Sequence, residues 1–137
     1  MNKNQADWIV NRLCPFILRE QGRGFAMSTW VDRDTPVGDP VIFDGVRRKV
    51  PSCGTICCIG GSICFLKKIN AADDREIFSS IGLSHKQGDD LCYGWKDDWP
   101  EPFRSRFAKA TTAVSKARVA VSLLKHIAKT RGKCLKS

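Results

Sequence analysis

Residues 53–66 form an uncharged run of small and apolar side chains that ends at Lys67. Such residues occupy every angular position for about three turns, so a helix here would have no solvent-facing side. We expect a buried central helix over residues 54–66. Gly60 and Gly61 each cost about 1 kcal/mol relative to alanine in a helix interior, so tertiary packing must hold the segment. A buried strand followed by a turn remains the alternative, because periodicity does not separate the two in short apolar runs.

The N-terminal segment predicts an amphipathic helix from Asn4 to Gln21, ended by Gly22 and Gly24. Pro15 lies inside it and lacks the N–H that an interior helical position uses. We therefore expect either a kink there or two shorter helices. One face carries the large apolar side chains Trp8, Ile9, Leu13, Phe16 and Ile17.

Residues 25–50 predict the β part of the fold. Residues 25–30 alternate as in a short strand, with Phe25 and Met27 directed inward, and residues 31–45 are rich in Asp, Pro and Gly, as in a surface loop. Residues 41–43 and 46–50 flank Asp44-Gly45, a dipeptide that suits a tight hairpin turn. The basic triplet at 47–49 is explained either by a solvated hairpin arm or by contact with an anion.

Two short helices are expected next, over residues 71–81 and from His85 to Cys92 or Tyr93. Gly82 suits the end of the first helix, and Ser84 with Gln87 forms a capping box for the second. Helix-turn-helix spacing raises the possibility of DNA reading. The second helix carries acids where base and phosphate contacts need donors, which disfavours that interpretation.

After an aromatic connector over residues 93–102, the chain from Glu101 onward is expected to be helical. A break near Thr111-Thr112 would divide it into two packed helices. An apolar seam with alternating steps of four and three closes either on the chain's own core or on a second copy in a homodimer. The seam consists of Phe103, Phe107, Ala110, Val114, Ala117, Val121, Leu124 and Ala128.

These elements predict a mainly α, compact helical domain around a buried central helix, with a small β-hairpin or short strands near residues 25–50. At 137 residues the chain is expected to form a single domain, 1–137. No apolar run has the length of a membrane span, and the N-terminus lacks the apolar centre of a secretory signal, so a cytoplasmic location and no membrane contact are expected.

Charge divides the chain unevenly. Residues 1–100 hold 13 Lys or Arg and 13 Asp or Glu, whereas residues 101–137 hold ten basic residues and one acid, Glu101. Such a concentration predicts a nucleic acid or an acidic protein surface as partner, with a merely solvated face as the alternative. Trp95 and Trp99 beside it would stack on bases if exposed. The candidate binding residues are Arg104, Arg106, Lys109, Lys116, Arg118, Lys125, Lys129, Arg131 and Lys133.

The stretch Cys53-Gly54-Thr55-Ile56-Cys57-Cys58-Ile59-Gly60-Gly61 resembles the Cys-Gly-Thr-x-x-Cys-Ile-x-Gly motif of small uncharacterised bacterial and phage proteins. The resemblance covers residues 25–105 and includes Phe25-x-Met27-x-x-Trp30 and Trp99-Pro100. It implies a phage or mobile-element setting, with inhibition of a host-defence component as one role, and it implies no catalytic residues. Such proteins often have His or Trp after the last glycine, where this chain has Ser62.

Seven cysteines, an odd number without an export signal, are interpreted as reduced core thiols. One enzymatic hypothesis remains beside the binding protein: a cysteine-dependent hydrolase or transferase. Cys53 would be its nucleophile at a helix start, with His85 or His126 as base. Zinc would need ligands from two helices, for example Cys57, Cys92 and His85, and no familiar ligand spacing supports it. We therefore expect no cofactor and favour a non-enzymatic interaction protein.

Overall fold

The computed structural model describes residues 1–27, 31–32, 40–43, 46–49, 56–69 and 74–136. Helices dominate and two antiparallel strand pairs accompany them, which confirms the predicted fold class. In chain order the elements are α1 (Lys3–Trp8), the π-helix η1 (Ile9–Leu13), α2 (Cys14–Ile17), α3 (Arg19–Gly22), β1 (Val31–Asp32), β2 (Pro40–Phe43), β3 (Val46–Lys49), β4 (Ile56–Cys57), α4 (Ile59–Lys67), α5 (Asp74–Ser79), α6 (His85–Tyr93), α7 (Phe103–Lys109) and α8 (Ala113–Thr130).

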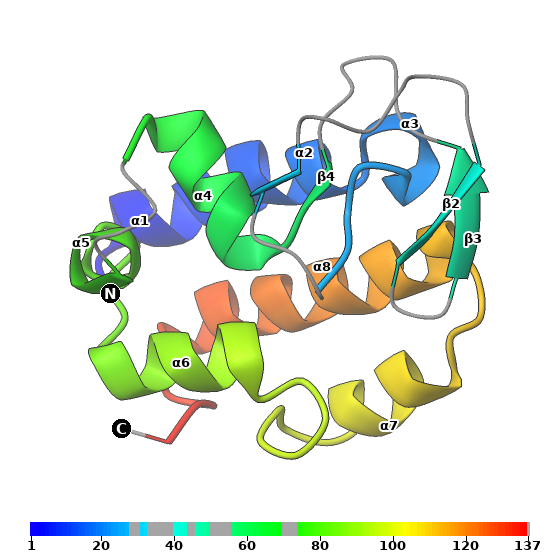
Figure 1. Cartoon of the computed structure of the whole chain (residues 1–137). Coiled ribbons are helices and arrows are strands. Elements are labelled where there is room, and N and C mark those ends of the chain that lie inside the picture. Colours follow the sequence, from blue (N-terminus) through cyan, green and yellow to red (C-terminus); the bar gives the residue numbers. More distant parts are fainter. Residues whose placement is uncertain (28–30, 33–39, 44–45, 50–55, 70–73, 137) are drawn as a thin grey trace.

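Helix α8, the longest element at 18 residues, runs through the middle of the molecule (Figure 1). It packs against α1, η1, α2 and α3 on one side and against α7 on the other. Its buried side chains form two adjacent strips with steps of four and three, so the helix separates two packed layers. The strips are Ala117, Val121, Leu124 and Ala128, and Lys116, Ala120, Leu123 and Ile127.

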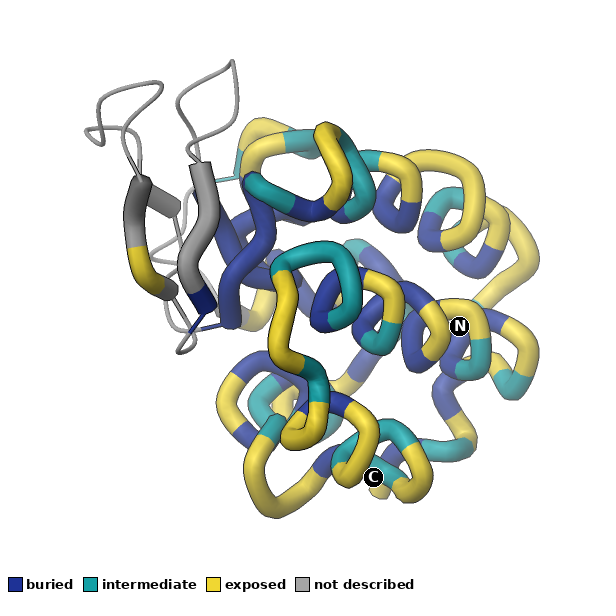
Figure 2. The backbone as a smooth tube through the Cα atoms, turned by 90° about the vertical axis from the view of Figure 1, so that its right-hand side faces the viewer, coloured by how far each residue is buried: buried dark blue, intermediate teal, exposed yellow. Residues whose placement is uncertain are grey.

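The predicted break between two C-terminal helices is confirmed. Thr112 caps α8: its side chain accepts a hydrogen bond from the Ser115 N–H at 3.1 Å, and the Ser115 hydroxyl lies 3.0 Å from the Thr112 N–H. The part of the predicted seam on α8 from Ala117 onward is buried, and α7 packs on α8. The seam therefore closes on the chain's own core. Figure 2 shows the buried sides of the helices turned towards one another.

The N-terminal helix predicted over residues 4–21 consists of shorter segments. Pro15 lies in the first turn of α2, where its missing N–H leaves no helical bond unmade. The preceding turn is a π-helix, in which the Cys14 N–H donates to the Ile9 carbonyl. Regular helix ends before Gln21, because Glu20 and Gln21 have φ of 47° and 60°. The predicted apolar face is buried at Ile9, Leu13 and Ile17, whereas Trp8 and Phe16 on the same face are half-buried.

The β part agrees with the prediction in its hairpin. Strands β2 and β3 pair antiparallel, with Phe43 opposite Val46, and Asp44-Gly45 between them lies outside the described residues. Phe25 and Met27 are buried as expected, although Phe25 makes only an isolated parallel bridge to Cys57. The predicted loop over residues 31–45 contains strand β1, which pairs with β4.

The buried helix begins five residues later than predicted, at Ile59 instead of residue 54. Ile56 and Cys57 form β4, because their backbone groups pair with β1 and with the segment around Gly24 and Phe25. Cys58 then caps α4, its sulfur accepting from the Gly61 N–H at 3.3 Å. Residues 59–64 are buried as expected, whereas Phe65 is 39% exposed, so the last turn reaches solvent.

Helix α6 has the predicted Ser84–Gln87 capping box, and Gly82, with φ of 79°, follows the end of α5. Residues 71–73 at the start of the predicted 71–81 helix lie outside the described residues. The aromatic connector folds inward: Trp99 is 1% exposed and donates its indole N–H to the Leu91 carbonyl at 2.9 Å. The molecule thus places α6 and α7 on the side of α8 opposite the N-terminal helices (Figure 1).

Candidate functional site

The exposed side of α8 carries a row of cations. Arg118, Ser122, Lys125 and Lys129 are its exposed residues between positions 118 and 129, and their spacing places them within an arc of about 60°. The three cations extend over about 16 Å of the helix. We call Arg118, Lys125, Lys129 and the adjacent Arg131 the basic face. The basic face is therefore a row of cations along one side of α8.

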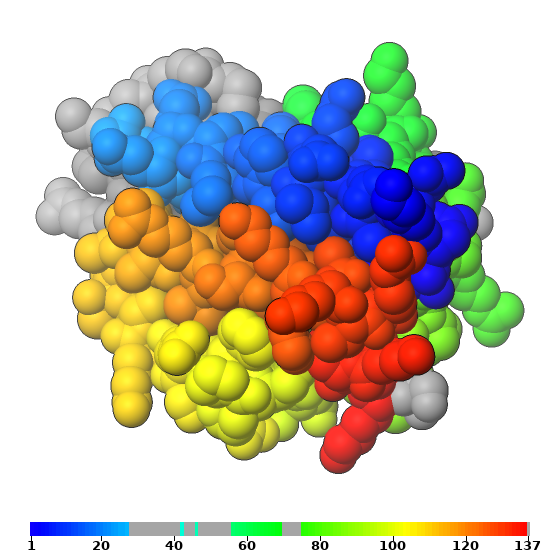
Figure 3. Space-filling view, turned by 180° about the vertical axis from the view of Figure 1, so that it is seen from behind, coloured from blue at the N-terminus to red at the C-terminus, as the bar shows by residue number. Residues whose placement is uncertain are grey.

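The two C-terminal helices contribute no negative charge beside the basic face. Neither α7 nor α8 contains an Asp or Glu. On the back of the molecule, α8 lies at the surface between the N-terminal helices and α7 (Figure 3). Cations held in a row without intervening acids produce a positive potential that attracts anions at a distance.

A shallow groove of about 270 Å³ lies between α1, η1 and the C-terminal half of α8. Asp7 and Val10 line it from the N-terminal segment, and Lys125, Lys129 and Arg131 line it from the basic face. Buried methyl groups of Ala6 and Ala128 complete its lining. The groove therefore combines three cations, one carboxylate and an apolar floor.

A structured turn fixes the end of this groove. Arg131 has φ of 54° and Gly132 φ of 82°, and the Gly132 N–H donates to the Ile127 carbonyl at 2.8 Å, as in a Schellman-type helix end. The Gly132 carbonyl accepts from Gln87 Nε2 of α6 at 3.1 Å. The backbone that carries Arg131 is thus tied to two helices.

Lys116 does not belong to the basic face, contrary to its place among the candidate binding residues. Its side chain is 7% exposed, and its ammonium donates to the Phe107 carbonyl at 2.9 Å and lies 4.2 Å from the centre of the Phe107 ring. The lysine points to the inner side of α8 because its position is opposite the exposed row. Its charge stabilises the contact between α7 and α8 and is not available to a partner.

The other candidate cations lie apart from the groove lining. Arg106 and Lys109 are exposed on α7, and Lys133 is exposed after the α8 turn. Arg104 is engaged within the chain: its Nε donates to Glu101 at 2.9 Å and its Nη1 donates to the Asp97 carbonyl at 2.6 Å. The structure thus brings three of the nine candidates, Lys125, Lys129 and Arg131, around one groove.

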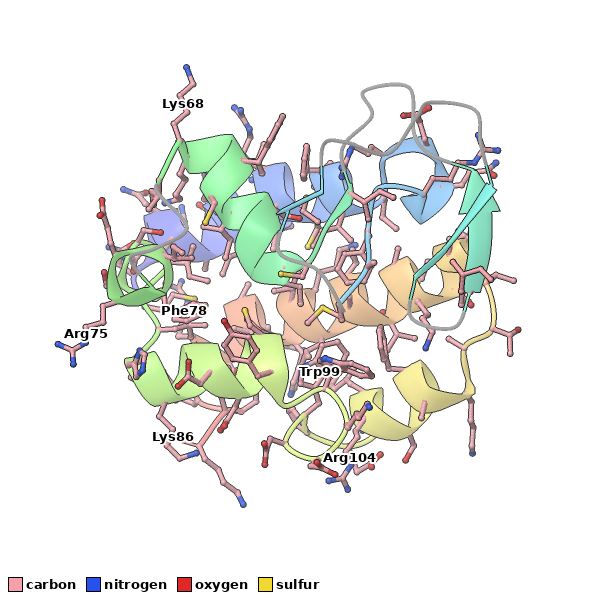
Figure 4. The ribbon with its side chains drawn as sticks, in the orientation of Figure 1. Lys68, Arg75, Phe78, Lys86, Trp99 and Arg104 are labelled. Atoms are coloured by element: carbon pink, nitrogen blue, oxygen red, sulfur yellow. The ribbon has the colours of Figure 1, made fainter. Side chains whose placement is uncertain are left out.

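A second cavity, of about 340 Å³, was not anticipated from the sequence. It lies between α6, the connector and the C-terminal segment, and its charges are mixed: Lys86, Arg104 and Lys136 face four acids, Asp90, Asp97, Asp98 and Glu101. Lys86 donates to Asp90 at 2.9 Å, and hydrogen bonds from Ser105 and Arg104 lower the pKa of Glu101. Figure 4 shows Lys86 and Arg104 projecting on this side, below the inward-pointing Trp99. The pairs Lys86–Asp90 and Arg104–Glu101 account for four of these seven charges.

The described cysteines are core thiols. Cys14, Cys57, Cys58, Cys64 and Cys92 are buried, and all six described cysteines are free of disulfides. Burial raises the pKa of Cys58 to about 12 and that of Cys14 to about 11, so both stay protonated at neutral pH. These two thiols are therefore poor nucleophiles or ligands.

The residues of the enzymatic hypothesis are only partly described. Cys53, its proposed nucleophile, lies outside the described residues. His85 is exposed at the start of α6 and pairs with Asp89 at 3.3 Å, and the His126 ring lies 5.5 Å from that of Phe103. Within the described part of the chain no group of three His, Cys, Asp or Glu could hold a metal ion, so the Cys57, Cys92 and His85 zinc arrangement is not formed.

Trp95 and Trp99, the tryptophans beside the basic segment, do not form an exposed surface on which bases could stack. Trp99 is buried, with its ring 4.9 Å from that of Phe107. Trp95 is half-buried, with its ring 5.8 Å from the same Phe107 ring. Trp99 therefore lacks the exposure that stacking on a base would require. Both rings support α7 from the inside.

Comparison of the chain with protein-family models, curated proteins and solved structures finds no match. Among the described residues, the helices are all too short or too polar to traverse a bilayer.

Proposed function

We propose that the protein is a non-enzymatic interaction protein that binds a polyanionic partner, a nucleic acid or an acidic protein surface, through its basic face. The observation that carries this proposal is the row of Arg118, Lys125 and Lys129 on one side of a helix that contains no acid. Cations used only for solubility are expected to alternate with acids around a helix, whereas a row of one sign concentrates the potential on one surface.

A cytoplasmic phage or mobile-element setting, with inhibition of a host-defence component as the role, is part of the same proposal. It is supported only by the resemblance of residues 53–61 to the motif of small bacterial and phage proteins. An acidic surface on a defence protein would be a suitable target for a small basic protein, because charge complementarity accelerates association and selects the partner.

The proposal is tested by reversing two charges of the basic face, Lys125→Glu and Lys129→Glu together. The matched control is Lys68→Glu with Arg75→Glu, which alters net charge by the same amount at two exposed positions away from α8 (Figure 4). Binding of each protein to a labelled short DNA duplex and to labelled poly-glutamate would be measured by fluorescence anisotropy over a range of salt concentrations.

We expect wild-type protein to bind at least one probe, with an affinity that falls log-linearly with salt. The Lys125/Lys129 variant should bind it at least about tenfold more weakly, and with DNA its salt slope should be shallower by about two, since two phosphate contacts are lost. The Lys68/Arg75 variant should stay within about twofold of wild type, because screening limits the effect of remote charges. Equal losses in both variants, or no wild-type binding at low salt, would contradict the proposal.

A further inference from the structure

The lining of the groove beside the basic face does not suit the two proposed classes of partner, nucleic acids and acidic protein surfaces, equally well. Its cations, Lys125, Lys129 and Arg131, would serve either class. Its remaining lining would not, because Val10 is 37% exposed there and the methyl groups of Ala6 and Ala128 lie beneath. A nucleic-acid backbone can offer this floor only the C–H groups of its sugars, and none of the described residues that line the groove is aromatic, so a base finds no ring to stack on there.

The carboxylate of Asp7 also favours an acidic protein segment over a nucleic acid. A nucleic-acid strand presents closely spaced charges of one sign, so Asp7 would face a phosphate whenever the neighbouring lysines bind two others. An acidic protein segment has its carboxylates separated by other side chains, and protein interfaces usually combine an apolar centre with a polar rim. Such a segment can place an apolar residue beside Val10 and direct carboxylates to the lysines on either side.

We propose that the groove is a docking site for an acidic protein segment in which an apolar side chain is flanked by carboxylates. This inference rests on the proposed function and narrows its partner to a protein. The apolar residue covers Val10 and Ala128, and the carboxylates pair with Lys125, Lys129 and Arg131. The structured turn at Arg131 and Gly132 holds part of the site in place before binding, which reduces the ordering cost of association.

The test uses two synthetic peptides that differ at one residue, Glu-Glu-Leu-Glu-Glu and Glu-Glu-Ser-Glu-Glu, together with a DNA duplex. Wild-type protein should bind the Leu peptide about fivefold more tightly than the Ser peptide, because packing of the Leu side chain on the exposed Val10 removes apolar surface of both from water. The Val10→Thr variant keeps the shape of the side chain but introduces a hydroxyl. It should lose most of the preference for Leu over Ser.

Val10→Ser gives an independent check, and thermal unfolding of both variants confirms that the fold is intact. No preference for Leu over Ser, or a preference that survives both Val10 variants, overturns the docking site. DNA binding tighter than that of either peptide, if reduced in the Lys125/Lys129 variant, would uphold the polyanion proposal and overturn the protein-segment inference. Binding of all three probes that is unaffected by reversal of Lys125 and Lys129 would overturn both.

Discussion

Lys116 shows how the same residue type serves two purposes on one helix. Its ammonium is buried against the carbonyl and ring of Phe107, whereas Lys125 and Lys129 are exposed on the opposite side. A charge reversal at Lys116 would place a carboxylate beside a carbonyl oxygen, away from water. Loss of function in such a variant would report unfolding and would say nothing of binding.

We predict that Lys116→Glu lowers the free energy of unfolding by about 3 kcal/mol or more, because it buries an unpaired charge. Lys116→Met keeps the aliphatic stem and should cost about 1 kcal/mol, the value of one hydrogen bond. The exposed Lys109→Glu serves as control and should change stability little. Urea unfolding followed by circular dichroism measures all three, and a Lys116→Glu variant as stable as the control would show that the ammonium is not buried.

We predict that the buried Cys58 thiol makes the folded protein less stable at alkaline pH. Burial raises its pKa from 9.0 to about 12, so the folded protein retains a proton that the unfolded chain releases above pH 9. The contribution of this thiol to the free energy of unfolding is complete below pH 9.0. It declines by about 1.4 kcal/mol per pH unit as the pH rises towards the pKa of the folded state. Cys58→Ser keeps a side chain able to cap α4 and removes the titrating thiol.

Denaturant unfolding at several values between about pH 8 and about pH 11 should therefore give a shallower decline for Cys58→Ser than for wild type. Cys14, whose pKa is raised to about 11 by burial, titrates in both proteins and cancels in the comparison. Parallel declines would mean that the Cys58 thiol reaches solvent in the folded state.

Close approach between elements depends on Gly22. It has φ of 77°, and a Cβ added to it would lie 2.6 Å from the Cβ of Ala117 and 2.9 Å from the Ala113 carbonyl oxygen. The turn at the end of α3 packs directly on α8 for this reason. We predict that Gly22→Ala destabilises the protein by about 2 kcal/mol or more, through strain and overpacking together. The exposed Ser122→Ala on α8 is the control, and thermal unfolding of both is the measurement. Equal midpoints would indicate that α3 and α8 are not in contact.

Elements specified by local sequence were predictable. The Ser84–Gln87 box, the break at Thr112 and the hairpin across Asp44-Gly45 each depend on residues within four positions of one another. The start of α4 was not predictable in this way, because Ile56 and Cys57 become a strand through pairing with residues 24–26 and with β1. The hydrophobic pattern of residues 53–66 alone does not indicate that a strand partner lies elsewhere in the chain.

The same distinction between features set by nearby residues and features set by distant contacts applies to the candidate site. The concentration of cations after residue 101 is visible in the sequence, and the steps of four, three and four between positions 118 and 129 could have located the exposed row. The opposite orientation of Lys116 follows from the same spacing. The contribution of Asp7 and Val10 could not be predicted, because it requires knowing that α1 lies beside the C-terminal half of α8 (Figure 3).

At the scale of the whole molecule, the net charge of +9 arises from residues 101–137. Within this segment Lys125 and Lys129 are exposed and four residues apart on one helix, so the repulsion between them lowers the free energy of unfolding. Ser122 lies in the same row, between Arg118 and Lys125. A carboxylate at position 122 would pair with cations on both sides, and glutamate is also a better helix former than serine. With a neutral serine at this position, the row contains no carboxylate that would compete with an anionic partner.

We predict that Ser122→Glu raises the free energy of unfolding by about 0.5 kcal/mol and weakens binding of the acidic Leu peptide by about fivefold, although no cation is removed. Ser122→Gln controls for side-chain size and helix propensity and should leave peptide affinity near that of wild type. Thermal unfolding and anisotropy titrations at the same low salt concentration measure the two effects. Opposite signs of the two changes would mean that the charge row is maintained for binding at the expense of stability. A gain in stability without any loss of affinity would instead identify the row as an ordinary solvated surface.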